Sequence, residues 1–188
     1  MRIVFALTLG AALLAGTAAS AAVAVVGNGP AKICYSEAET GWDTKLGIKA
    51  CDDALKGETL SMVDRASTLI NRGILKARTD DIDGAMKDYA VALVVGENTG
   101  EAYLNRSATE ISLRRYDEAK VDADLAISHD TKRMEIAYYN RAVANEALGN
   151  VGAAFQDYKA ALELAPGFAA ARQQLARYRV TQRSSGGT

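Results

Sequence analysis

The chain has 188 residues, with 22 Lys and Arg against 23 Asp and Glu and a formal net charge of −1. Because no basic field dominates, this balance argues against nucleic acid as a partner. The length is sufficient for one domain.

The first 22 residues are expected to be a secretory signal peptide. Arg2 is followed by an apolar run at residues 3–15 and by the small residues Ala19, Ser20 and Ala21, the order typical of such a peptide. We place cleavage after Ala21 or one residue later. An uncleaved membrane anchor is the alternative, but the apolar run is short for a span. The mature chain is therefore expected to be exported, periplasmic or secreted, without stable membrane insertion.

Residues 23–60 are expected to form a helical hairpin that caps the fold. Pro30 suits the first turn of a helix and Gly41 its end. Asp43 can cap a second helix that ends before Gly57. Trp42, in the intervening turn, is interpreted as a packing anchor, with a contact to a partner as the alternative.

Two cysteines, Cys34 and Cys51, lie on the facing apolar stripes of this hairpin. In an exported protein two cysteines usually form one disulfide, and we predict Cys34–Cys51. A redox pair or a metal site is the alternative. It is less favoured because redox pairs lie closer in sequence and no histidine accompanies these two.

The rest of the chain repeats with a period of 34 to 35 residues. An Asn-Arg pair recurs at residues 71–72, 105–106 and 140–141. Alanines follow in a constant register at positions 85, 119 and 154, and again at 92, 126 and 161. Small residues at fixed places allow helices to approach closely. In the strongest copy, residues 135–168, Gly149 separates two helices and Pro166 ends the second.

This spacing resembles that of the tetratricopeptide repeat family, whose unit is a helix–turn–helix of 34 residues. Three units fit, at 66–99, 100–133 and 135–168, within a solenoid that spans 61–182. Lys76, Glu110 and Asn145 replace the mid-helix tyrosine of the family. The resemblance covers more than half of the chain. It implies an all-α, right-handed α-solenoid that acts as a non-enzymatic protein-binding module.

The C-terminal part is expected to close the solenoid. Residues 169–181 show an apolar face and a polar face, as a capping helix does. Its arginines are interpreted as a solvated surface, with binding of an anionic partner as the alternative. Residues 182–188 are rich in Ser and Gly and are expected to be disordered.

Each repeated arginine is followed sixteen residues later by an aspartate. The two residues fall on the two helices of one repeat, so we predict structural ion pairs. The alternative is that the arginines hold carboxylates of a ligand. The predicted pairs are Arg72 with Asp88, Arg106 with Asp122, and Arg141 with Asp157.

The repeated asparagines are candidates for peptide binding. In the family that the chain resembles, the first helices line the concave surface, where an asparagine can both donate to and accept from an extended main chain. Hydrogen bonding inside the solenoid is the alternative, and cap helices that cover part of the groove are another. The groove lacks the lysine-rich set by which some family members hold a C-terminal carboxylate. The predicted groove residues are Ile70, Asn71, Ile74, Leu104, Asn105, Ala108, Ile111, Tyr139, Asn140 and Val143.

Catalysis finds no support in the motifs. His129 is the only histidine and sits at a predicted helix end, where it suits a helix C-terminal cation better than a catalytic base. We predict no catalytic, cofactor or metal site, and a partner protein whose peptide or helix lies in the groove. The alternatives are a structural self-assembling subunit and an assembly factor of the cell envelope.

Overall fold

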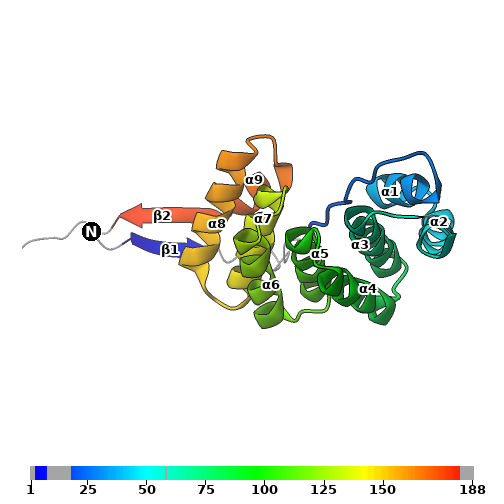
Figure 1. Cartoon of the computed structure of the whole chain (residues 1–188). Coiled ribbons are helices and arrows are strands. Elements are labelled where there is room, and N and C mark those ends of the chain that lie inside the picture. The colour runs from blue at the N-terminus through cyan, green and yellow to red at the C-terminus, as the bar shows by residue number, and fades with distance from the viewer. Residues whose placement is uncertain (1–2, 8–17, 58, 183–188) are drawn as a thin grey trace, which may run out of the picture.

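The structure is a computed structural model that describes residues 3–7, 18–57 and 59–182 (Figure 1). In these ranges there are nine helices: α1 to α8 form a row of four antiparallel pairs, and α9 packs on the last pair. Two short strands form a ribbon beside the last pair. The expected all-α solenoid of helical repeats is confirmed, whereas the ribbon is not part of the prediction. The helices are α1 (Pro30–Thr40), α2 (Thr44–Gly57), α3 (Met62–Arg78), α4 (Ile82–Val95), α5 (Thr99–Ser112), α6 (Tyr116–Ser128), α7 (Met134–Ala147), α8 (Val151–Leu164) and α9 (Ala169–Leu175).

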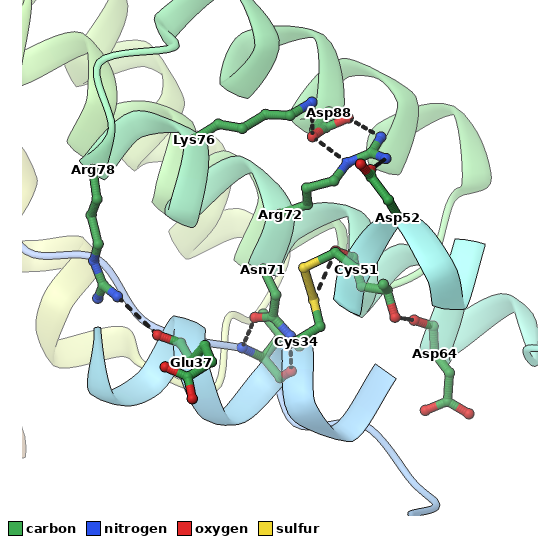
Figure 2. Close-up of a disulfide and its surroundings, with 12 residues drawn as sticks. Cys34, Glu37, Cys51, Asp52, Asp64, Asn71, Arg72, Lys76, Arg78 and Asp88 are labelled. Carbon is green, nitrogen blue, oxygen red and sulfur yellow. Dashed lines mark hydrogen bonds and ion pairs between the residues drawn. A yellow bond between two sulfur atoms is a disulfide. The ribbon is translucent and has the colours of Figure 1, made fainter. Parts of the chain in front are cut away.

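The N-terminal cap is the pair α1 and α2. Pro30 begins α1, and Gly41 ends it with a left-handed φ of 70°. Cys34 and Cys51 are fully buried between the two helices and form a disulfide (Figure 2). Trp42 is not a packing anchor, because it is 91% exposed. The turn that carries it lies at the outer end of the hairpin, where no further helix covers it (Figure 1).

The three repeats are the pairs α3–α4, α5–α6 and α7–α8. Their periodic alanines are buried to the last atom, as close approach of helices requires. Gly73 shows how tight the contact is, since a Cβ atom there would lie 2.5 Å from the ring of Tyr89. Each repeat therefore buries the faces that its neighbours would otherwise expose.

The turn inside each repeat uses a residue with positive φ at the same place. Gly149 has φ 80° in the third repeat, but Asp80 (65°) and Arg114 (59°) hold this conformation in the first two. A residue with a side chain pays a conformational cost here that glycine avoids. These turns are therefore recognised by their equivalent position in each repeat and not by the presence of a glycine.

The C-terminal prediction is wrong in its extent. The capping helix was expected over residues 169–181, but α9 ends at Leu175. Tyr178–Gln182 forms strand β2 and pairs antiparallel with strand β1 (Ile3–Leu7). The aromatic and β-branched residues at 178, 180 and 181 favour a strand, and a partner strand at the N-terminus satisfies its main chain.

Several boundaries of the predicted domains also change. Residues 23–26 do not belong to the cap hairpin, because they continue an extended segment that begins at residue 18. Part of the predicted signal peptide and residues 183–188 of the predicted tail lie outside the described residues. Among the helices of the described ranges, none has the length and apolar character needed to span a bilayer.

The disulfide yields a first test. It closes a loop with a sequence separation of 17, and a crosslink over such a loop stabilises a fold by about 3 kcal/mol. We expect reduction to lower the free energy of unfolding by about this amount in denaturant titrations. A Cys34→Ala/Cys51→Ala variant is the control. Equal stability of the parent with and without reductant would contradict the prediction.

Candidate peptide-binding face

An extended segment, residues 18–26, crosses the first helices of all three repeats. We call the surface formed by α3, α5 and α7 the first-helix face. In the third repeat, Asn140 of α7 pairs with Ala19, near the start of the segment. The Oδ1 atom accepts from the Ala19 N–H at 3.0 Å, and the Nδ2 atom donates to the Ala19 carbonyl at 2.9 Å.

The same two-bond pairing recurs in the other two repeats. Asn105 of α5 accepts from the N–H of Ala21 at 2.9 Å and donates to its carbonyl at 3.0 Å. Asn71 of α3 does the same with Val23, at 2.8 and 2.7 Å (Figure 2). We call these three residues the asparagine ladder. The segment therefore runs from the third repeat to the first and advances two residues for each repeat.

Asparagine suits this task because one amide carries both a donor and an acceptor. An extended residue presents its N–H and C=O on the same side, so one amide satisfies both. All three asparagines are fully buried, and a buried amide without partners costs about 1–3 kcal/mol for each missing bond. The first-helix face is thus built to hold a main chain.

Side chains of the segment alternate between the face and the solvent. Ala21, Val23 and Val25 are buried, while Ser20, Ala24 and Val26 are exposed. This is the two-residue period of an extended chain. The segment ends where the N–H of Val26 donates to Asp64 at 3.0 Å, after which Gly27 turns the chain with a φ of 110°.

The predicted groove residues lie beneath this segment. Val23 packs in one cluster with Ile70 and Ile74, and Ala21 packs in another with Leu104. Ile111, Tyr139 and Val143 belong to the cluster of the last repeat, against which Ala18 and Ala19 pack. Ala108 lines a cavity beside the segment. The cover over the groove is thus the N-terminal segment, not the cap helices.

Tyr139 departs most from its predicted role. It is 1% exposed, and its ring lies 5.7 Å from that of Tyr158 and 5.0 Å from that of Phe168. These aromatic contacts make it a core residue of the third repeat. Replacement of Tyr139 would therefore damage the fold and is not a clean test of binding.

The segment itself is not among the features predicted from the sequence. Its small and β-branched residues also fit the end of a signal peptide and the start of a cap. The signal that could have found it is the alternation at Ala21, Val23 and Val25, since a strand-like period next to three repeated amides suggests pairing.

The arginines and aspartates meet across the two helices of each repeat. Arg72 contacts Asp88 through Nε at 2.8 Å and through Nη2 at 2.6 Å. Arg106 with Asp122, and Arg141 with Asp157, form the same two-bond arrangement.

Two of the three arginines also reach a neighbouring helix pair. Arg72 contacts Asp52 of α2 at 2.6 Å, and Arg141 contacts Asp124 of α6 at 2.7 Å. Asp88, Asp122 and Asp157 are buried. Two-bond pairs of this kind between an arginine and a buried aspartate fix the orientation of one helix on another. Figure 2 shows Arg72 between its two carboxylates, next to the disulfide.

Comparison with known proteins agrees with the repeat architecture. Residues 136–168 match the family model for the tetratricopeptide repeat. Serine/threonine-protein phosphatase 5 of Homo sapiens is 34% identical over 89 residues, which are 47% of this chain and 18% of that protein. The DnaJ homolog subfamily C member 7 homolog of Schizosaccharomyces pombe is 29% identical over 143 residues, 73% of this chain and 30% of that protein.

The α7–α8 pair spans the residues that match the tetratricopeptide repeat model. A solved structure, the first TPR of Spaghetti (RPAP3) bound to HSP90 peptide SRMEEVD, has a similar fold, with a TM-score of 0.57 at 24% identity. The likeness covers 61% of this chain and 90% of that chain. The chain spans less than a third of the length of the phosphatase and of the DnaJ homolog, so their activities lie beyond what the shared repeats show.

The residues that stand where tetratricopeptide repeats have a mid-helix tyrosine all lie next to the aspartates that pair with the repeat arginines. Lys76 contacts Asp88 at 2.9 Å, and Asn145 donates to Asp157 at 3.2 Å. Glu110 holds this place in the second repeat. It is 6% exposed, and its Oε2 atom has no hydrogen-bond partner among the described residues. Burial, together with the charge of Asp122, raises the pKa of Glu110 to about 8.

The described residues contain no group of three or more His, Cys, Asp or Glu side chains placed to hold a metal ion. His129 is exposed at the end of α6 and lies 3.2 Å from the hydroxyl of Thr99 through Nδ1. Its ring centroid also lies 5.4 Å from that of Tyr103. These contacts place His129 at the turn between the second and third repeats, against the start of α5.

Glu110 predicts a dependence of stability on pH. In an unfolded chain a glutamate titrates near pH 4.3, whereas Glu110 titrates near 8 in the folded state. The folded chain binds the extra proton between these values, so stability falls as pH rises through this window. We expect Glu110→Gln to remove a loss of roughly 1–2 kcal/mol between pH 5 and 8, after allowance for solvent screening.

The measurement is denaturant unfolding of parent and variant at pH 5, 6, 7 and 8. Exposed Glu163 supplies the matched control, and Glu163→Gln should follow the parent curve. Parallel curves for the parent and Glu110→Gln would show that Glu110 is ionised in the folded state at all these pH values.

Proposed function

We propose that the protein is a non-enzymatic protein–protein interaction module of the cell envelope, whose first-helix face binds an extended peptide segment of a partner protein. The observation that carries this proposal is the asparagine ladder. Three buried amides pair with the main chain of every second residue of an extended segment. Nothing in this pairing depends on the side chains of the segment, so another extended chain with small residues would fit.

Export links this face to a partner. Cleavage after Ala21, as a signal peptide predicts, would remove Ala19 and Ala21 from the ladder. Asn140 and Asn105 would then lose their partners in the segment, while Val23 would stay on Asn71. Two buried amides beside exposed apolar surface favour the uptake of a new chain. The precursor would thus keep the face closed, and the mature protein would present it in the periplasm or outside the cell.

A protein of similar fold holds a peptide, HSP90 peptide SRMEEVD, on its TPR module. This supports a peptide as the class of ligand for the present chain. It does not identify the partner, because the similarity is at the level of the fold.

Peptide binding can be measured directly. A fluorescent peptide with the sequence of residues 18–21, the part of the segment that cleavage removes, should bind the processed chain that begins at residue 22, and should bind the full chain much more weakly because its own segment competes. We expect Asn105→Ala/Asn140→Ala to weaken binding by roughly tenfold to a hundredfold, since four hydrogen bonds are lost. Fluorescence anisotropy gives the dissociation constants.

Asn150→Ala is the matched control, because Asn150 precedes the first residue of α8 and lies outside the ladder. Circular dichroism of each variant verifies that the helices remain folded. Equal affinity of the parent and the double variant would contradict the proposed function. Analytical ultracentrifugation of the full chain tests the alternative, a self-assembling subunit. That alternative requires the molecular mass in solution to rise with protein concentration.

A further inference from the structure

A cavity of about 430 Å³ lies beside the N-terminal segment, between the first and second repeats. Its apolar wall includes Ile74 of α3 and Ala108 and Ile111 of α5. Ala18 and Ser20 of the segment form another wall. The cavity is therefore part of the first-helix face, but it is separate from the asparagine ladder.

Ser20 lines the cavity at the point where the segment passes from Asn140 to Asn105. It stands between Ala19 and Ala21, which hold Asn140 and Asn105. Its side chain is exposed and consists of one carbon and one hydroxyl. The small side chain of Ser20 thus leaves most of the cavity empty of side chain, while the main chain of its neighbours Ala19 and Ala21 is held by the asparagine ladder.

Two arginines line the same cavity. Arg78 lies in the last turn of α3, and Arg114 lies in the turn between α5 and α6. Both are exposed. Arg78 donates only to the main-chain carbonyl of Glu37, at 3.4 Å (Figure 2). In the described part of the chain, neither arginine makes an ion pair with a carboxylate.

This sets them apart from the arginines of the repeats. Arg72, Arg106 and Arg141 each hold one aspartate through two bonds. The cavity thus combines apolar walls with two guanidinium groups that have no carboxylate. A side chain that complements it has methylene groups near its base and a carboxylate at its end.

We propose that this cavity takes the glutamate side chain of an extended partner segment, at the position that Ser20 holds between two rungs. The partner motif has a small residue, a glutamate and a second small residue, and neither small residue is proline. Proline is excluded because each rung residue donates its N–H to an asparagine. This inference rests on the proposed function and adds to it the chemistry of the partner.

The full chain tests the inference through its own segment. Ser20→Glu places the proposed side chain in the cavity, and Ser20→Gln is the matched uncharged control. We expect the unfolding equilibrium constant of Ser20→Glu to be about fivefold smaller than that of Ser20→Gln at low salt. The difference should shrink in 0.5 M salt and should vanish when Arg78→Gln and Arg114→Gln are added.

A second pair of variants separates this inference from the proposed function. Ala21→Pro removes an N–H that donates to Asn105 of the ladder, whereas Ala24→Pro alters an exposed residue that follows the last residue held by the ladder, Val23. Greater destabilisation by Ala21→Pro, together with equal stability of Ser20→Glu and Ser20→Gln, would overturn the glutamate site alone. Equal effects within both pairs would contradict the ladder as well. An advantage for Ser20→Glu that persists without the arginines would also overturn the site.

Discussion

Three buried asparagine amides hold the main chain of one extended segment, and the arrangement of the rest of the molecule follows from what they require. Each amide is fully buried and has both its donor and its acceptor satisfied by a single residue. A buried amide without these bonds would be costly, so a chain lying across the first-helix face stabilises it. In this structure the chain is residues 18–26, which pack on the apolar residues that flank the amides.

The ladder depends on the regularity of the solenoid. Its rungs are two residues apart in the segment but 34 and 35 residues apart in the helices, so each repeat must place its first helix in the same way. Buried alanines set how closely the helices approach, and the forked pairs of arginine and aspartate set their orientation. The second repeat differs in having Glu110 beside Asp122, where burial and the adjacent charge favour the protonated carboxyl group.

Much of this architecture was predictable because it repeats. The period located the helix pairs, the arginine–aspartate spacing and the three asparagines, since a helix places residues of one register on one face. The occupant of the face was not predictable in the same way. Residues 18–26 are small and apolar, which fits a signal peptide as well as an extended strand, and only the amides across the face distinguish the two. Likewise, residues 176–181 continue an amphipathic helical pattern, but pairing with Ile3–Leu7 makes a strand of their last part.

The most direct measurement is amide hydrogen exchange of the full chain, resolved by residue with NMR. The central claim is that the asparagine ladder holds the N–H groups of Ala19, Ala21 and Val23. These three amides should exchange far more slowly than the amide of exposed Ala24, and protection at Ala21 should be lost in Asn105→Ala. Exchange of all four amides at the rate of an unfolded chain would contradict the account, because the segment would then not be bound on the first-helix face.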